Sequence, residues 1–278
     1  VHRKQPPGLA LLFGVEMWER FSYYGMRALL VLYLVNALNW SPADASHLYG
    51  TFTSLVYLTP LVGGWLADRW IGTRRSLVVG GVVIAAGNFS MAAAHWFGLP
   101  VFYLGLGLIV IGTGFFKPNV STMVGQLYEE HDPRRDAGFT IFYMGINLGA
   151  FLAPLVAGYL GERVGWWLGF GAPGVGMLLG LLMYLWGKDK YLPGIGLPRA
   201  REKDAAGQVK ADAPLTREEK EWVAVIFLVA FFVIFFWSAY EQAGASLNIF
   251  ADRHTDRVVA GFEVPASWFQ SVNPLAIL

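Results

Sequence analysis

The stretch Glu16-Met-Trp-Glu19-Arg20-Phe-Ser-Tyr23-Tyr-Gly-Met-Arg27 lies inside an apolar run, Leu9–Leu38, that is long enough to cross a membrane as a helix. At 100° per residue, the two glutamates, the two arginines and Tyr23 fall on one face of that helix. An arginine at mid-membrane costs about 2.5–3.5 kcal/mol, whereas a leucine returns only about 0.3–0.6 kcal/mol. We therefore expect this face to point into protein or a water-filled cavity, where it meets opposite charges.

Further apolar runs of membrane-spanning length follow along the chain. Of its 278 residues, 55% are hydrophobic and only 15% charged, against about 25% charged in soluble proteins. An eighth run begins near Pro265 and stops at Leu278 inside apolar sequence, so we expect the chain to be incomplete. The fold class predicted is an all-α membrane protein, with spans at Leu9–Leu38, His47–Arg69, Ser76–His95, Val101–Leu127, Gly138–Gly161, Trp166–Gly187 and Trp222–Phe250.

The domain organisation follows from one long polar stretch. Residues 188–221 are rich in Lys, Arg, Asp, Ala, Pro and Gly, which is typical of a linker, and a short amphipathic helix is expected from Thr216. Six spans, a polar linker and further spans are typical of a two-bundle transporter. We predict a six-helix bundle over residues 1–187, a cytoplasmic linker over 188–221, and the start of a second bundle over 222–278.

The positions of Lys and Arg between the spans predict the orientation. No Lys or Arg lies between spans one and two or between spans three and four. By the positive-inside rule we expect the N-terminus and the linker to be cytoplasmic. The residues that carry this assignment are Arg3, Lys4, Arg69, Arg74, Arg75, Arg134, Arg135, Lys188 and Lys190. Because the pattern is that of a helical bundle and not a barrel, we expect a multi-pass protein of a cytoplasmic-type membrane, namely a bacterial plasma (inner) membrane.

Partners for the charged face are sought on other helices. Glu19 and Arg20 are adjacent in sequence and leave the helix in different directions, so we expect at least one to pair elsewhere. Lys117, at the centre of span four and just before Pro118, is the natural partner, and Glu241 lies deep in span seven. Acids and bases from three helices suit a zwitterion with separated charges, and the shielded carboxyl groups are candidates for proton exchange.

Three simpler interpretations of these charges stay open. The first-span cluster could only fix helix packing, Lys117 could reach an interface, and Glu241 could be permanently paired to one base. Arg27 could likewise reach the outer interface.

Several functional classes are disfavoured by composition. A net charge of +1 gives no indication of nucleic-acid binding, and the absence of cysteine excludes disulfides and thiolate sites. We find no histidine-rich metal cluster, nucleophile motif or phosphate-binding loop, so no enzyme, metal or cofactor is expected.

Together these motifs resemble the proton-dependent oligopeptide transporter (POT/PTR) family of the major facilitator superfamily. Glu16–Gly25 looks like the family's ExxERFxYY motif, and a loop after span two is similar to the general superfamily signature. The other matching segments are Gly112–Asn119, Phe142–Phe151, Glu241–Gly244, Trp268–Pro274 and, for the loop, Gly64–Arg75.

The resemblance implies a proton-coupled symporter that imports di- and tripeptides by alternating access, working as a monomer in the lipid bilayer. By position, Arg20 and Lys117 would meet the peptide carboxylate, and Glu241 the amino group and a proton. Glu16 and Glu19 would be proton-linked acids. The remaining implied residues are Tyr23, Arg27, Tyr57, Asn147 and Asn273 in the pocket, and Asp68, Arg69, Arg74 and Arg75 in a gating loop.

Two alternatives remain. A proton-coupled transporter of nitrate or another small solute would share the fold, although the retained Glu16, Lys117 and Glu241 favour peptide. A half-length membrane interaction module without transport is the alternative from a different class. One departure from animal members is Gly50, which stands where they carry a histidine, so proton coupling here would rest on carboxylates.

Overall fold

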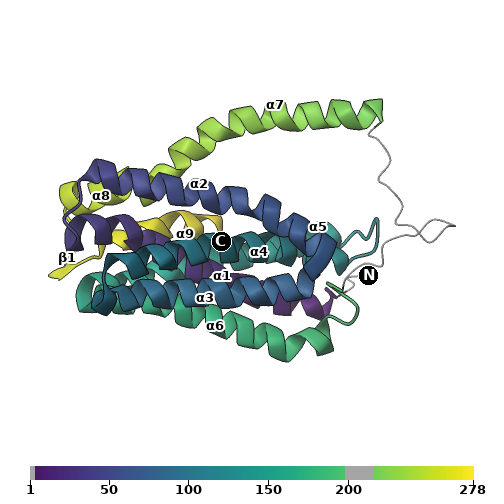
Figure 1. Cartoon of the computed structure of the whole chain (residues 1–278), viewed down its shortest axis with the longest axis horizontal. Helices are drawn as coiled ribbons and strands as arrows, with labels where there is room; N and C mark the ends of the chain where they lie inside the picture. The colour runs from purple at the N-terminus through teal and green to yellow at the C-terminus, as the bar shows by residue number, and fades with distance from the viewer. Residues whose placement is uncertain (1–3, 198–215) are drawn as a thin grey trace. The chain divides into compact units, whose positions relative to one another are not determined.

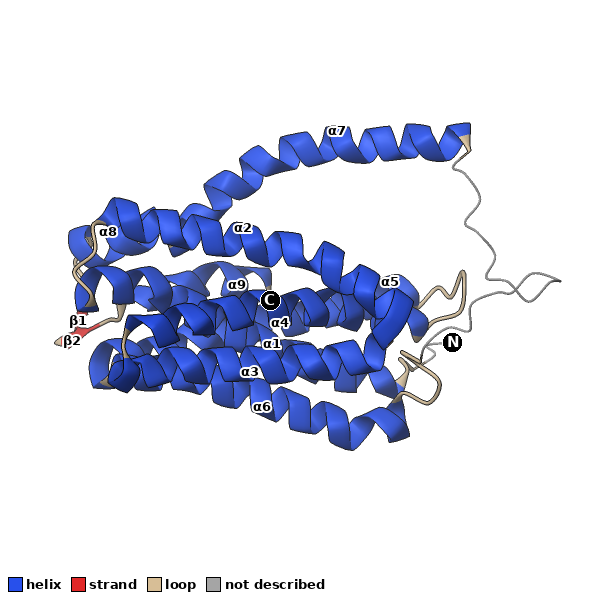
Figure 2. Cartoon of the chain, in the orientation of Figure 1, coloured by secondary structure: helices blue, strands red, loops and turns tan. Residues whose placement is uncertain are grey.

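A computed structural model describes residues 4–197 and 216–278, and nearly all of them are helical (Figure 2). The first six long helices run side by side (Figure 1). Their limits match the predicted spans to within about five residues once the π-helical turns that continue α1, α2 and α5 are included. The bounds are α1 Pro7–Leu32, α2 Pro42–Leu66, α3 Thr73–Phe97, α4 Leu99–Gln126, α5 Arg135–Ala153 and α6 Trp166–Tyr191.

Helix α1 is central to this bundle. It packs along α5 and α6 and also meets α2, α3 and α4, and most of its residues are buried. By length and composition alone, five helices of the described residues could cross a membrane: α3, α4, α5 extended to Val164, α6, and α7 extended to His254. Helix α1 falls outside that set because it carries four charged residues, yet it is the helix on which the others pack.

Four of the long helices are followed by turns that are not α-helical: π-helical turns follow α1, α2 and α5, and a 3-10 turn follows α7. These turns lie at helix ends, where the bundle changes direction. They are the π-helical turns Tyr33–Ala37, Ala67–Ile71, Pro154–Gly158 and Leu160–Val164, and the 3-10 turn Glu241–Gly244.

Helices α3 and α4 are held close together by two pairs of glycines. A Cβ added to Gly112 would lie 2.8 Å from the carbonyl oxygen of Gly80, and one added to Gly87 would lie 2.8 Å from that of Gly105. The pairs are two helical turns apart, so the two backbones touch over a long stretch. Small residues at helix crossings are typical of membrane bundles, where close packing replaces the hydrophobic effect between helices.

Residues 199–243 form a compact unit distinct from residues 1–198 and 244–278. Within it, helix α7 spans Arg217–Tyr240. The Thr216 hydroxyl accepts a hydrogen bond from the Glu219 N–H at 3.2 Å, and the Glu219 carboxylate accepts one from the Thr216 N–H at 2.7 Å. This capping box starts α7, so the short helix expected from Thr216 is the first turn of α7. Most of the predicted linker lies outside the described residues.

The predicted span Trp222–Phe250 lies within one stretch, Arg217–His254, that is long and apolar enough to cross a membrane, but this stretch is not one continuous helix. Helix α7 ends at Tyr240, the 3-10 turn Glu241–Gly244 follows, and helix α8 occupies Ser246–His254. A Cβ on Gly244 would collide with the phenol ring of Tyr49, so only a glycine fits against α2 at the point where the helix is interrupted. The apolar composition of residues 222–250 does not indicate this interruption, because the contact with Tyr49 involves a residue far away in the sequence.

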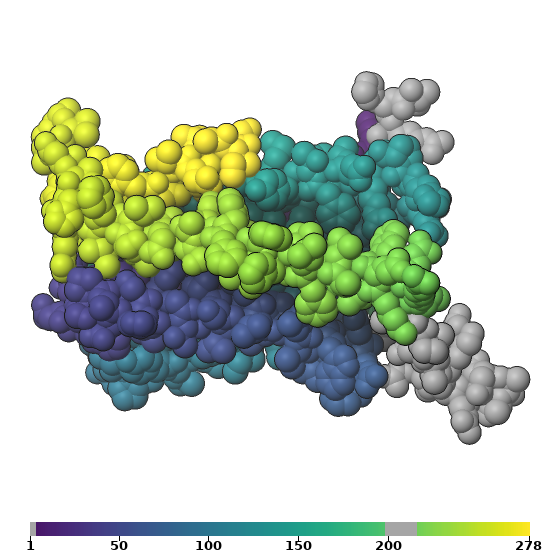
Figure 3. Space-filling view, turned by 90° about the horizontal axis from the view of Figure 1, so that it is seen from above, coloured from purple at the N-terminus to yellow at the C-terminus, as the bar shows by residue number. Residues whose placement is uncertain are grey.

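The last residues of the chain add a hairpin and a helix start. Strand β1 (Val258–Val259) pairs antiparallel with β2 (Phe262–Glu263), with Val258 opposite Glu263. A 3-10 turn, Ala266–Ser271, and helix α9, Val272–Ile277, then follow Pro265, as predicted for an eighth span. Together with α8 they gather toward one end of the molecule (Figure 3).

We call the end where α1 stops and α6 begins the distal end, and the opposite end the proximal end.

The glycine contact between α3 and α4 yields a prediction. Gly112→Ala should lower the free energy of unfolding by about 1–3 kcal/mol, because the new methyl group forces two touching backbones apart. The matched control is Gly107→Ala in the same helix, since nothing lies within 4 Å of a Cβ at that position. Thermal unfolding of the purified protein in detergent compares the two variants. Equal melting temperatures would contradict the packing described here.

Candidate functional site

The charged residues of α1 form a buried cluster. Only 3% of Glu16, 0% of Glu19 and 5% of Arg20 is exposed. The Arg20 Nε lies 3.1 Å from Glu16 Oε1 and also donates a hydrogen bond to Glu19 Oε2. One guanidinium therefore pairs with two carboxylates of its own helix.

The contact between Glu19 and Arg20 corrects the expectation that these neighbours would not pair directly. The two Cβ atoms do point in different directions, but the arginine side chain is long enough to fold back along α1. The interaction is thus made by the side-chain ends, which the directions of the Cα–Cβ bonds do not limit.

Part of the cluster has no hydrogen-bond partner within the described residues. This holds for Glu16 Oε2, Glu19 Oε1 and Arg20 Nη2, all of them buried. A buried polar atom of a charged group is costly when it lacks a partner. The cluster therefore has free capacity for a proton, for water or for a charged ligand.

Other helices bring further charged and aromatic groups to this face. Lys117 of α4 interacts electrostatically with Glu16, and its ammonium lies 4.6 Å from the centroid of the Tyr57 ring of α2. Arg20 lies 5.5 Å from the centroid of the Tyr23 ring. The structure thus brings α1, α2 and α4 together around both signs of charge, as predicted for Lys117.

Arg27 extends the same face toward the distal end. Its Nε donates a hydrogen bond to the hydroxyl of Tyr49 at 2.6 Å, and its guanidinium lies 5.4 Å from the Tyr24 ring centroid. Arg27 is 4% exposed, so it does not extend into solvent within this unit. Tyr49 was missed in the sequence, where it reads as an ordinary aromatic residue of span two.

Helix α5 closes the cluster from another side. A Cβ on Gly149 would collide with the Met17 carbonyl and would lie 3.0 Å from Arg20 Cβ. The α5 backbone therefore touches α1 at the charged residues. Nearby, the buried Asn147 donates from Nδ2 to the Tyr143 carbonyl of its own helix at 2.9 Å.

Two predicted pocket residues are not brought to the cluster by a described contact. Asn273 is exposed in the first turn of α9. Glu241 belongs to the unit of residues 199–243, so its approach to the α1 cluster stays a prediction.

The predicted gating residues divide into two kinds. Asp68, Arg69 and Arg75 are exposed. Arg74, in contrast, donates hydrogen bonds to the carbonyls of Ile195, at 2.7 Å, and Leu192. Arg74 thus fixes the chain beyond α6 to the start of α3 at the proximal end, which is a packing role, and the gating role of this loop stays a prediction.

An apolar cavity of about 860 Å³ lies elsewhere in the same unit. None of its lining residues is ionisable, and its α1 residues Met17, Trp18 and Phe21 lie on the side of the helix away from the charged face. It therefore cannot supply the polar groups that a charged ligand needs. We assign the candidate site to the charged face of α1.

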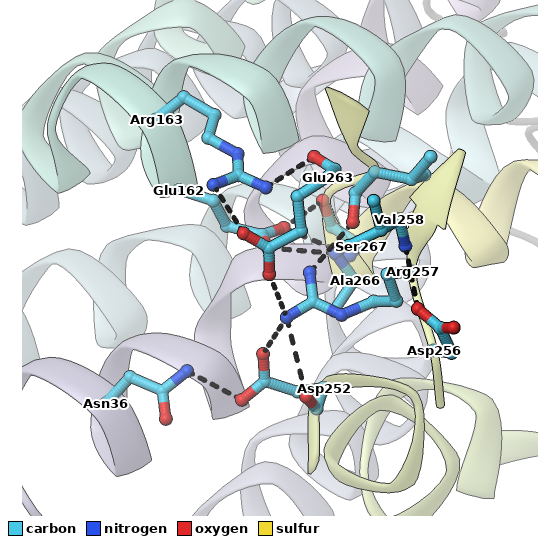
Figure 4. A network of polar contacts seen from close by, with 11 residues as sticks. Asn36, Glu162, Arg163, Asp252, Asp256, Arg257, Val258, Glu263, Ala266 and Ser267 are labelled. Atoms are coloured by element: carbon cyan, nitrogen blue, oxygen red, sulfur yellow. Dashed lines mark hydrogen bonds and ion pairs between the residues drawn. The ribbon is translucent and has the colours of Figure 1, made fainter. Parts of the chain in front are cut away.

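Sequence reasoning missed a polar network at the distal end (Figure 4). Its charged residues lie just beyond the predicted limits of spans five and seven, where charges are normally taken as solvated, while Asn36 lies near the end of span one and Ala266 and Ser267 begin span eight. The one available signal was the adjacent acid and base directly after the predicted end of span five. The network comprises Asn36, Glu162, Arg163, Asp252, Arg257, Glu263, Ala266 and Ser267.

Comparison with known proteins gives consistent similarities. The model of the POT family matches residues 74–193 and 201–278. A peptide transporter of Yersinia enterocolitica is 36% identical over 333 residues, with 98% of this chain and 65% of the relative covered. A di-/tripeptide transporter of Lactococcus lactis subsp. cremoris is 39% identical over 272 residues, covering 95% of this chain and 52% of the relative. The chain thus spans between half and two thirds of the length of these curated relatives.

Solved structures agree with the fold. A crystal structure of a peptide transporter POT in complex with sulfate has a TM-score of 0.79 at 35% identity, covering 100% of this chain and 67% of that one. A POT family transporter in complex with 5-aminolevulinic acid has a TM-score of 0.79 at 29% identity, with 100% and 69% covered.

Because Arg20 is the counter-ion of both Glu16 and Glu19, we expect its removal to lower the free energy of unfolding strongly. Arg20→Gln should destabilise the fold by about 3–5 kcal/mol, because two buried carboxylates lose their counter-ion. Adding Glu19→Gln should recover part of this loss. Chemical or thermal unfolding in detergent measures both, with the exposed Arg75→Gln as control, for which a change within about 0.5 kcal/mol is expected. An Arg20→Gln protein as stable as the control would mean that the cluster is not buried in the folded protein.

Proposed function

This chain belongs to the POT family, and on that premise we propose that it forms the N-terminal part of a symporter that imports di- and tripeptides together with protons. Its relatives include proteins named as a peptide transporter and a di-/tripeptide transporter. The proposed protein is a monomeric, multi-pass component of a bacterial plasma membrane, without enzymatic activity and with no cofactor beyond the coupling proton.

The observation that carries the proposal is the sharing of one guanidinium by two carboxylates in the buried α1 cluster. When one carboxyl group takes up a proton, the other still pairs with Arg20. The cluster can therefore change its charge by one unit without leaving an unpaired buried arginine. That property suits a site through which protons pass, and it supports Glu16 and Glu19 as proton-linked acids.

The same cluster provides a reason for coupling. A peptide carboxylate is a natural partner for Arg20 and Lys117, because Arg20 has a buried Nη2 without a hydrogen-bond partner among the described residues and Lys117 brings a second cation to the same face. As the peptide carboxylate approaches, it competes with Glu16 and Glu19 for these cations. A glutamate that loses its counter-ion binds a proton more readily, so peptide and proton enter together.

The amino end of the peptide needs an acid, which we assign to Glu241. A site that holds both termini of a peptide reads its main chain, and side chains of many kinds are then accepted. Tyr23, Arg27, Tyr57, Asn147 and Asn273 are proposed to line the space between. Alternating access follows if the proximal end faces the cytoplasm, as the Lys and Arg distribution favours, and the distal end faces outside.

The test uses the gene product that contains this sequence, reconstituted in liposomes. Under an inward proton gradient, dialanine should accumulate inside, and a protonophore should abolish the accumulation. Lys117→Ala should lower uptake by about tenfold or more, since a charge-assisted contact with the peptide carboxylate is lost. The exposed loop variant Glu130→Gln should import dialanine at the unmodified rate.

Two results would contradict the proposal. Well-folded protein that imports no di- or tripeptide would exclude peptide transport and favour nitrate or another small solute, which the same liposomes can test. Full uptake by Lys117→Ala would remove this lysine from the site.

A further inference from the structure

Glu162 binds the start of a helix more than a hundred residues away (Figure 4). Its Oε2 accepts a hydrogen bond from the Ala266 N–H at 2.9 Å, and its Oε1 accepts from the Ser267 N–H at 3.0 Å and the Ser267 hydroxyl at 2.5 Å. These N–H groups begin the segment Ala266–Ile277, where a helix has no acceptors of its own. A carboxylate at a helix N-terminus is also favoured by the helix dipole.

Ion pairs beside Glu162 extend this contact across the distal end. Arg163 pairs with Glu263 at 3.1 Å and donates to the Glu263 carbonyl. Arg257 pairs with both Glu263 and Asp252 at 3.1 Å. The Asp252 carboxylate in turn accepts a hydrogen bond from Asn36, at the end of α1, at 2.9 Å. Residues 252–267 are therefore tied to α1 and to the turn that ends α5.

The contact continues along one row of α5 and its following turn. The Trp268 Nε1 donates a hydrogen bond to the Leu155 carbonyl at 3.1 Å, and the Ser271 hydroxyl donates one to the Phe151 carbonyl at 2.8 Å. Gly158 lies between Leu155 and Glu162, and a Cβ there would collide with the Ser267 hydroxyl. A glycine at this point is what allows Ser267 to reach Glu162.

Most of these contacts differ from the backbone-to-backbone crossings of the bundle, although the close approach of Ser267 to Gly158 is one packed contact among them. Most are polar, and water can replace each of them. The Arg163 and Glu263 side chains are 31% and 47% exposed, and the apolar cluster beneath them contains only three buried residues: Leu32, Ala251 and Ala266. At the distal end, polar contacts that are partly exposed therefore surround a small apolar cluster.

We propose that Glu162 is a positioning residue which, with Arg163, forms a latch that closes the distal end in this conformation. The distal latch consists of Glu162, Arg163, Glu263, Ala266 and Ser267. It holds the start of the segment that carries Asn273 against the six-helix half. Resting on the transport function proposed above, the latch opens in each cycle so that substrate can enter from the distal side, and its strength sets the balance between the two conformations.

The first experiment locks the latch covalently. The 278 residues given contain no cysteine, so Gly158→Cys with Ser267→Cys introduces the only pair within this sequence, and any cysteine elsewhere in the gene product is first replaced by serine. The two Cβ atoms would lie 3.0 Å apart, a small shift from the range of about 3.5–4.5 Å in disulfides. Dialanine uptake should fall to background once mass spectrometry shows the cross-link, and a reductant should restore it. Each single cysteine variant is the control for oxidant damage. Unchanged uptake by fully cross-linked protein would overturn the latch, because a permanent packing contact tolerates the bond.

The second experiment does not depend on transport. Ala251→Cys places a thiol in the small buried cluster, where a membrane-impermeant maleimide reaches it only when the distal end opens. Adding Glu162→Gln should raise the labelling rate about tenfold, because the amide nitrogen replaces one acceptor of the helix N–H groups. Asp44→Asn, an exposed acid at the same end, should leave labelling unchanged.

The two experiments separate failure of the latch from failure of the transport function. Equal labelling rates of Ala251→Cys with and without Glu162→Gln would contradict the latch. This second experiment remains decisive if the double cysteine variant of the first experiment does not fold. A labelling response in a protein that imports no peptide would preserve the latch and reject only the proposed substrate.

Discussion

The structure depends on the burial of two carboxylates and a guanidinium in the central helix. Glu16, Glu19 and Arg20 could not face lipid without a cost that the apolar residues of one helix cannot offset. Helix α1 is therefore surrounded by protein on this face, and its neighbours must come close. Gly149 lets the α5 backbone touch α1 beside Arg20, and Lys117 contributes charge from α4. The sharing of the Arg20 guanidinium by two buried carboxylates is the feature from which proton-coupled transport is proposed.

Two kinds of contact divide the described residues. Within residues 4–197, helices meet at glycine pairs and buried apolar residues, and Arg74 fastens the chain beyond α6 to α3. Between this half and residues 244–278, most of the contacts named above are hydrogen bonds and ion pairs near the distal surface. The first kind is costly to separate because packed backbones would leave voids, whereas water can replace the second. A rigid half with a separable distal closure is the arrangement that alternating access requires.

Much of this architecture was predictable from the sequence. The long apolar runs gave the six-helix bundle and the start of an eighth span at Pro265, and helical periodicity gave the charged face of α1. The pairing of Arg20 with Glu19 was not predictable from backbone directions, because the arginine side chain folds back on its own helix. The interruption of the seventh span at Glu241–Gly244 and the β1–β2 hairpin also escaped prediction. The interruption coincides with the contact between Gly244 and Tyr49, two residues far apart in the sequence. The hairpin turn is formed by Ala260 and Gly261 and lacks the asparagine or aspartate that usually indicates such a turn. The distal latch depends on residues over a hundred positions apart, which periodicity cannot connect.

The most direct test of the central claim separates coupling from binding. In liposomes, Glu19→Gln should abolish accumulation of dialanine driven by a proton gradient, while gradient-independent exchange of labelled for unlabelled dialanine continues. That result would assign proton coupling to the buried α1 cluster, because peptide would still bind and cross. Accumulation at the unmodified level by Glu19→Gln would contradict the account, since the cluster would then carry no coupling proton at this residue.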